Sequence, residues 1–189
     1  MTFYLGNQPD ANIQVYSNPY MLQQFGRLVK MYKMLANYTA TVIHECVRYG
    51  IPAQRPLVLH YEDDPIAVNS KYQYMYGPDL LIAPVLQSNV TKQRVYLPKG
   101  EWVFMWNNAT IVAGGQYTTV PSPIGRPPVF YKKSSPFALT FDTIGMTPLV
   151  PPPPTRPPTT QSTNSAVAQF VNVVTLMLTF YMYLAHELS

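Results

Sequence analysis

Between residues 79 and 145 the sequence consists of short apolar segments separated at close intervals by turn signals, and this spacing constrains the fold more than any other feature. Turn-forming residues lie between the segments, among them Gly114-Gly115, which we predict to be a hairpin turn. Short strands with such regular turns are typical of an antiparallel β-sandwich, which we predict over residues 79–145. The expected strands are residues 80–85, 94–97, 102–106, 116–120, 129–132 and 137–141.

The N-terminal part has a different pattern, in which apolar residues recur at spacings of three and four. Asn18 and Pro19 are suited to begin a helix as N-cap and first residue, and Gly50 is suited to end one. We expect a break in this helical segment at residues 37–39. The apolar run at residues 57–61 predicts a strand buried on both faces. The expected apolar face of the first helix consists of Leu22, Phe25, Leu28, Tyr32 and Leu35.

The C-terminal part is divided into a linker and an apolar segment. Residues 146–165 are rich in Pro, Thr and Ser, which predicts an extended, semi-rigid spacer. Residues 166–185 carry no charge, and a helix of about 20 residues spans the ~30 Å hydrocarbon layer of a bilayer. We therefore predict a single apolar helix there, with the membrane as its partner. Small residues at 162–166 also suit a lipid-anchor signal, but the polar spacer that such a signal needs is too short.

The expected location follows from the two ends of the chain. Residues 1–6 lack the basic and long apolar regions of a signal peptide, so the chain as written would insert by its tail and face the cytosol. An upstream signal peptide would instead place the same residues in the lumen or outside the cell. Asn37, Asn89 and Asn108 begin N-x-[ST] sequons at expected loops or helix breaks, which makes them candidate glycosylation sites.

Several classes of protein are disfavoured by the polar residues. The 13 Lys and Arg residues are scattered rather than gathered in a stripe, so we expect no nucleic-acid partner. The 3 His residues and the single cysteine, Cys46, share no ligand spacing, so we expect no metal and no cofactor. The acids Glu62-Asp63-Asp64 follow a predicted buried strand, where barrel enzymes hold catalytic groups. Three adjacent acids before a proline nevertheless favour a solvated turn.

An ordered series of motifs resembles glycoside hydrolase family 31. The motifs are Gly50-Ile51-Pro52, Arg55-Pro56-Leu57, the run from Tyr74 to Val85, Val95-Tyr96-Leu97-Pro98, Trp102-Val103, Trp106 and Gly114-Gly115. The resemblance covers residues 6–141. It implies that residues 1–78 are the last strand and helices of a (β/α)8 catalytic barrel, and that the sandwich follows this barrel remnant.

Three further motifs are similar to bacterial sulfoquinovosidases, a branch whose animal relatives include a stilbene-disulfonate-binding (SITS-binding) protein. They lie at residues 6–10, 59–64 and 123–131. The family cleaves α-glycosides by a retaining mechanism with two aspartates on earlier barrel strands, and no residue here matches either motif. The resemblance therefore implies no catalytic residue in this chain. Tyr4 stands where the family has a sugar-binding histidine and is the one candidate substrate-binding residue.

These observations leave three functional hypotheses. The chain is the C-terminal part of a family 31 hydrolase acting on sulfoquinovosides or α-glucosides, and is inactive alone. Alternatively, it is a non-catalytic, membrane-tethered module that binds carbohydrate or sulfonate. A third reading is a gene remnant without function. All three predict that the chain alone does not hydrolyse glycosides.

Overall fold

The computed structural model of the protein describes residues 15–107 and 110–151. A main compact unit contains all of these except Leu86–Asn89, which belong to a second unit and form a turn. The helices are α1 (Pro19–Met34), α2 (Ala36–Tyr49), the 3-10 helix η2 (Leu57–Leu59), α3 (Pro65–Val68) and α4 (Ala138–Gly145). The strands are β1 (Gln54–Pro56), β2 (Tyr74–Tyr76), β3 (Leu80–Ile82), β4 (Lys92–Leu97), β5 (Glu101–Phe104), β6 (Ile111–Ala113), β7 (Gln116–Pro121) and β8 (Val129–Lys132).

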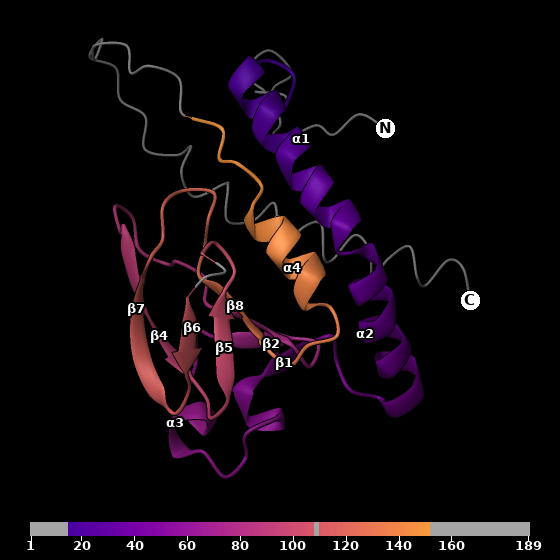
Figure 1. Ribbon diagram of the computed structural model, residues 1–189, viewed down its shortest axis with the longest axis vertical. Helices are drawn as coiled ribbons and strands as arrows, with labels where there is room; N and C mark the ends of the chain where they lie inside the picture. The colour runs from indigo at the N-terminus through magenta and orange to yellow at the C-terminus, as the bar shows by residue number, and fades with distance from the viewer. Residues whose placement is uncertain (1–14, 108–109, 152–189) are drawn as a thin grey trace, which may run out of the picture. The chain divides into compact units, whose positions relative to one another are not determined.

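The strands of the main unit form two antiparallel sheets (Figure 1). One sheet has the strand order β1-β2-β3-β8-β5-β6, and the other is the ribbon β4-β7. This arrangement confirms the antiparallel, sandwich-like fold predicted for the segment after residue 79. The predicted boundary at residues 78 and 79 falls between β2 and β3, which pair within the same sheet. The assignment of residues 1–78 to a barrel remnant stays a prediction.

The core lies where the two sheets meet. Trp102 on β5 is fully buried, and its indole Nε1 donates a hydrogen bond to the Pro98 carbonyl oxygen at 2.8 Å. This bond satisfies the one polar atom that burial of a tryptophan removes from water. The other buried residues of this cluster are Leu57, Ala67, Met75, Leu81, Ala83, Val95, Tyr96, Leu97, Phe104, Val120 and Phe130.

The predicted hairpin at Gly114-Gly115 is wrong. The two glycines connect β6 to β7, and these strands belong to different sheets. Their backbone N–H groups donate to the carbonyl oxygens of Gly100 and Leu97, both at 2.7 Å. The segment therefore crosses over between sheets because its hydrogen bonds go to the β4–β5 connection rather than across a two-strand turn.

The helix ends are predicted better than the helix break. The Asn18 side chain caps α1 by accepting from the Tyr20 N–H at 2.8 Å, and Gly50 ends α2 in the left-handed region at φ 70°. The break lies at Leu35, not at residues 37–39. Tyr38 and Thr39 are buried in α2, so tertiary packing keeps these residues helical despite their low intrinsic preference for helix.

The predicted apolar face of α1 is only partly correct, because Phe25 and Leu28 are partly buried whereas the buried residues of this helix are Gln24 and Arg27. The Gln24 amide donates to the Val150 carbonyl oxygen at 3.0 Å, and the Arg27 guanidinium donates to the Gly125 carbonyl oxygen at 3.1 Å. Backbone carbonyls on the facing segments thus hold polar side chains inward. Leu22 and Tyr32 of the predicted face are exposed.

The apolar run at residues 57–61 is not a strand. The chain pairs as β1 only up to Pro56 and then turns into η2, where the N–H groups of His60 and Tyr61 both donate to the Leu57 carbonyl oxygen at 3.0 Å. Leu57 is 0% exposed whereas Leu59 is 54% exposed, so only one side of the run is buried. A continuous apolar run had suggested burial on both faces.

The predicted strand at residues 137–141 is a helix instead, α4. Its buried residues Phe141, Ile144 and Gly145 recur at helical rather than strand spacing. Phe141 packs between Tyr38 of α2 and Tyr131 of β8, with ring centroids 5.1 Å and 5.3 Å apart. Figure 1 shows α4 between the helix pair α1–α2 and the large sheet.

The predicted linker lies mostly outside the described residues, and the predicted apolar helix at 166–185 lies wholly outside them. Within residues 15–107 and 110–151, no helix is both long and apolar enough to cross a membrane.

Candidate functional site

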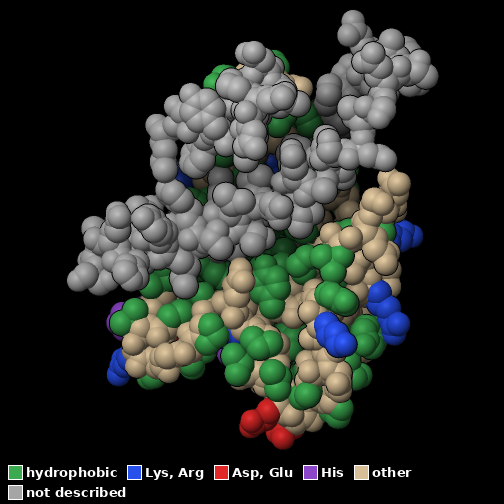
Figure 2. Space-filling view, turned by 180° about the vertical axis from the view of Figure 1, so that it is seen from behind, with side chains coloured by type: hydrophobic (Ala, Val, Ile, Leu, Met, Phe, Trp, Pro, Cys, Tyr) green, Lys and Arg blue, Asp and Glu red, His purple; other side chains and the backbone are tan. Residues whose placement is uncertain are grey.

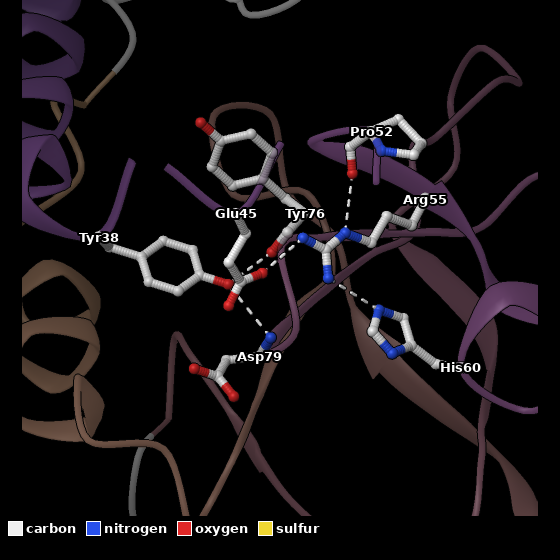
Figure 3. A network of polar contacts seen from close by, with 7 residues as sticks. All are labelled: Tyr38, Glu45, Pro52, Arg55, His60, Tyr76 and Asp79. Carbon is white, nitrogen blue, oxygen red and sulfur yellow. Dashed lines mark hydrogen bonds and ion pairs between the residues drawn. The ribbon is translucent and has the colours of Figure 1, made fainter. Parts of the chain in front are cut away.

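A polar network centred on Arg55 joins α2, β1 and the segment after η2 (Figure 3). Arg55 is 2% exposed, and its guanidinium reaches three partners. Its Nη2 pairs with Glu45 Oε2 at 2.7 Å, its Nε donates to the Pro52 carbonyl oxygen at 2.8 Å, and its Nη1 lies 3.2 Å from His60 Nε2. Burial of a guanidinium is tolerated because its donors are distributed over these acceptors.

The network fixes the protonation state of His60. Every nitrogen of Arg55 is a donor, so His60 Nε2 must accept and the proton of the neutral ring must lie on Nδ1. Burial, and then the positive charges of Arg55 and Lys132, lower the pKa of His60. Glu45 and Asp79 oppose this shift but do not reverse it.

Stability should therefore depend on pH through His60. The unfolded chain binds a proton near the ordinary histidine pKa of about 6.5, whereas the folded chain resists it. We expect the free energy of unfolding to be greatest above that pH and to fall as the pH drops from about 6.5 through the lowered pKa of the folded state. Denaturant titrations across this range should show a weaker pH dependence in His60→Gln, whose amide oxygen still accepts from Arg55. The exposed His44 gives the control variant His44→Gln, which should keep the wild-type slope. Equal slopes in all three proteins would contradict this assignment.

A second chain of hydrogen bonds continues from α2 to the end of β8. The Tyr38 hydroxyl donates to the Tyr76 carbonyl oxygen at 2.6 Å and accepts from the Asp79 N–H at 3.1 Å. The Ser135 hydroxyl then donates to Asp79 Oδ2 at 2.9 Å. Burial raises the pKa of the Tyr38 hydroxyl, so it stays protonated and keeps its role as donor. The chain ties α2 to the β2–β3 turn.

Five of the seven carboxylates among the described residues make structural contacts, and the other two, Glu62 and Asp63, are exposed. Glu45 pairs with Arg55, Asp64 accepts from Tyr96 and caps α3, and Asp79 accepts from Ser135. Asp142 accepts from the Tyr131 hydroxyl, and Glu101 pairs with Lys133 on the surface. Retaining hydrolysis needs two carboxyl groups on opposite sides of one glycosidic bond, about 5 Å apart. The carboxylate contacts hold helices and strands in place. No two carboxyl groups at Arg55 face each other as retaining hydrolysis requires.

Metal binding is not indicated in the part of the chain that the structure describes, where no three His, Cys, Asp or Glu side chains are grouped to hold an ion. Cys46 is a free thiol on α2 and is partly buried.

Two of the predicted site residues, Asn37 and Asn89, lie within the described residues, and neither takes part in this network. Asn37 is exposed in the first turn of α2, and Asn89 is exposed in a turn with φ 61°. Tyr4 and Asn108 lie outside the described residues. The glycosylation and substrate-binding assignments stay predictions.

The network itself was missed from the sequence, although one signal was present. Tyr38, Val42 and Glu45 are spaced four and three apart and share the buried face of α2. A carboxylate on that face requires a buried cation. Arg55 is the first cation after the end of α2, which would have identified the pair.

The segments that form the two sheets match a known protein family. Residues 50–135 match the sequence profile of the glycosyl hydrolase family 31 C-terminal domain. This range contains both sheets, Arg55 and two of its three partners, Pro52 and His60. The chain carries the C-terminal domain of glycoside hydrolase family 31.

Within the family, the chain is similar to sulfoquinovosidases. It is 40% identical to the sulfoquinovosidase of Agrobacterium fabrum over 136 residues, which are 71% of this chain and 20% of that protein. The sulfoquinovosidase of Escherichia coli is 37% identical over 141 residues, 75% of this chain and 20% of the relative. The solved structure of a family 31 sulfoquinovosidase from E. rectale, with the aza-sugar inhibitor IFGSQ, has 43% identity and a TM-score of 0.69 over 74% of this chain and 21% of that one. The chain thus spans about a fifth of the length of these relatives.

Proposed function

We propose that this chain is the C-terminal part of a family 31 glycoside hydrolase acting on α-glycosides of the sulfoquinovoside or α-glucoside class. In this proposal the enzyme uses a retaining mechanism with two aspartates, and both aspartates come from a part of the protein that precedes the chain. The observation that carries the proposal is the likeness to sulfoquinovosidases over only a fifth of their length. The structural contacts of Glu45, Asp64 and Asp79 also support it.

In this proposal the rest of the barrel attaches at the edge of β1. Among the described residues β1 pairs with β2 alone, and it is the edge strand of the large sheet. Apolar side chains near this edge and on α1 and α2 are exposed, and Figure 2 shows hydrophobic side chains over much of the described surface on the face it presents. Exposed apolar surface of this kind is typical of an interface. The exposed residues are Leu22, Val47, Tyr49, Ile51 and Leu59.

The Arg55 network gives the chain its role in this proposal. Arg55 holds β1 against α2, so the strand is fixed in place before any neighbour pairs with it. A preorganised edge reduces the ordering that association would otherwise require. The domain then closes the barrel and braces its last strand.

Turnover of chromogenic α-glycosides tests the proposal. The chain alone is expected to hydrolyse neither 4-nitrophenyl α-sulfoquinovoside nor 4-nitrophenyl α-glucoside above the rate of buffer. Genomic or transcript sequence upstream of Met1 is expected to encode both aspartate motifs in frame, and the protein that includes them is expected to turn over one of the two substrates. Hydrolysis by the 189-residue chain alone would overturn the proposal that both catalytic aspartates lie outside this chain.

A membrane-tethered, non-catalytic module that binds carbohydrate or sulfonate is our second proposal. It is supported by the Pro-rich composition of residues 146–165 and the uncharged apolar sequence of residues 166–185. Sedimentation with liposomes tests it, since a variant that ends at residue 151 should stay in the supernatant while the full chain pellets. If the full chain and the shortened variant partitioned equally, the proposed membrane attachment would be refuted.

Glycosylation reports which side of the membrane the chain faces. If residues 1–165 enter the lumen, the exposed Asn37 and Asn89 are expected to carry glycans, and glycosidase treatment of the native protein should increase its gel mobility. The variants Asn37→Gln and Asn89→Gln should each remove part of that shift. An unchanged mobility would place these residues in the cytosol, as expected for insertion by the tail alone.

A further inference from the structure

An open depression lies in the main unit between the segment after α3 and the β4–β7 ribbon. Its volume is about 300 Å³, which is enough for one sugar ring with its substituents. Its lining includes Asn69, Lys71 and Tyr72 on one side, and Gln93, Arg94 and Tyr117 on the other.

Two tyrosines present aromatic surface at the depression. Tyr72 is 66% exposed and Tyr117 is 46% exposed, although large aromatic side chains are usually covered in a folded chain. The face of a tyrosine ring is apolar and its hydroxyl is polar, which matches the C–H face and the hydroxyl groups of a pyranose ring. The pair therefore offers a stacking surface for a sugar.

The position of Tyr117 is fixed by its neighbours. The Arg94 guanidinium carbon lies 3.9 Å from the centre of the Tyr117 ring, and the Tyr96 ring centre lies 5.2 Å from it. Tyr96 is buried, and its hydroxyl donates to Asp64 Oδ2 at 2.6 Å. A ring held in this way loses little further freedom when a ligand binds.

The opposite side of the depression is joined to the ribbon by one side chain. The Gln73 amide donates to the Tyr96 carbonyl oxygen at 2.7 Å, and its oxygen accepts from the Tyr96 N–H at 2.8 Å. Gln73 thus bonds to β4 in the manner of a neighbouring strand. These two bonds set the distance between Tyr72 and the ribbon, so both sides of the depression belong to one rigid frame.

The charge of the lining selects an anionic ligand. Lys71 and Arg94 line the depression, no acidic residue does, and neither cation is ion-paired with a carboxylate among residues 15–107 and 110–151. The Asn69 and Gln93 side chains add amide groups that suit sugar hydroxyls. Two cations beside exposed aromatic rings favour a ligand that is both saccharide and anion.

We infer that this depression binds a pyranose that carries an anionic substituent. The substituent is a sulfonate, a sulfate or a carboxylate. The ring packs on Tyr72 and Tyr117, and the anionic group lies at Lys71 and Arg94. The inference concerns binding and stands independently of hydrolysis, so the absence of turnover leaves it intact.

Saturation-transfer NMR and calorimetry on the purified full chain test the inference with three probes. Glucose 6-sulfate is expected to bind with a dissociation constant on the order of 1 mM, and methyl α-glucopyranoside and inorganic sulfate are each expected to bind at least tenfold more weakly. Arg94→Gln and Tyr117→Ala should each weaken the binding of glucose 6-sulfate about tenfold. Tyr117→Phe keeps the ring and should bind within about twofold of the wild type.

A matched pair of exposed residues serves as control. Arg48 lies over the ring of Tyr49 at 5.2 Å, and Tyr49 is 60% exposed, but neither residue lines the depression. Arg48→Gln and Tyr49→Ala should therefore leave binding unchanged. Equal affinity for inorganic sulfate would reduce the site to an anion site and overturn the inference. So would absent binding of glucose 6-sulfate, or wild-type affinity in folded Arg94→Gln and Tyr117→Ala, where circular dichroism verifies folding.

Discussion

Arg55→Met is expected to lower the free energy of unfolding by about 3 kcal/mol, because it leaves buried acceptors without their donor. Glu45 would lose its ion pair, and the carbonyl of Pro52 and Nε2 of His60 would lose hydrogen bonds. The Glu45 side chain is 31% exposed, so water partly solvates it after the change and the loss stays below the upper range for buried pairs. Urea denaturation of the full chain, followed by circular dichroism, measures the difference.

The partner variants show whether the loss belongs to the network. Glu45→Gln keeps an acceptor for Arg55 and should cost about 1 kcal/mol, and the double variant should cost clearly less than the sum of the two single changes. The surface pair of Lys133 and Glu101, at 3.4 Å, provides the control. Lys133→Gln should change stability by less than about 0.5 kcal/mol. If Arg55→Met cost no more than this control, the network would not be structural.

Gly114→Ala is expected to cost about 3 kcal/mol through a direct clash with the backbone. A Cβ at this position would lie 1.9 Å from the Pro98 carbonyl oxygen, which belongs to the β4–β5 connection and cannot rotate away. The backbone of Gly114 is not in the left-handed region, so the cost arises from space alone. Thermal or urea unfolding of the variant measures it.

Two other glycines separate this cause from conformational strain. Gly115 has φ +80° and open space around it, so Gly115→Ala should cost about 1 kcal/mol through its backbone conformation alone. Gly26 lies within α1 with nothing near its Cβ position, so Gly26→Ala should stabilise the chain by about 0.5 kcal/mol. The close approach at Gly114 would be refuted if Gly114→Ala were as stable as Gly115→Ala.

The strands of the sandwich were predictable because they carry local signals. The predicted strand at 129–132 coincides with β8, and the strands at 94–97, 102–106 and 116–120 differ from β4, β5 and β7 by one or two residues at one or both ends. Turn residues bound each of these segments, and turn chemistry depends on nearby residues alone. The helix start at Asn18 and the stop at Gly50 were predictable for the same reason.

The errors in the prediction arose where distant contacts decide the local structure. The segment at 137–141 has the composition of a strand, but Phe141 packs against Tyr38 and Tyr131 as part of a helix. α1 buries Gln24 and Arg27 because carbonyl groups more than 90 residues away accept from them. The strands β1 and β6 escaped prediction because three residues are too few to show a period.

The candidate sites were harder to predict than the fold. The partners of Arg55 each lie within ten residues of it in sequence, yet one of them is a backbone carbonyl, which no motif reveals. The depression at Tyr72 and Tyr117 depends on Gln73 bonding to β4, 23 residues away. Exposure of an aromatic ring is a property of the folded surface, which the sequence alone does not reveal.

The proline in β1 restricts what can add to that strand. β1 has three residues, and its last one, Pro56, has no N–H to offer a neighbour. A short edge interrupted by proline is a poor template for indiscriminate strand addition, so the domain carries its own protection against fibrous self-association. A polypeptide that joins the sheet at β1 must therefore be selected by the fit of its side chains rather than by backbone pairing. Association at this edge is then specific to a matching partner.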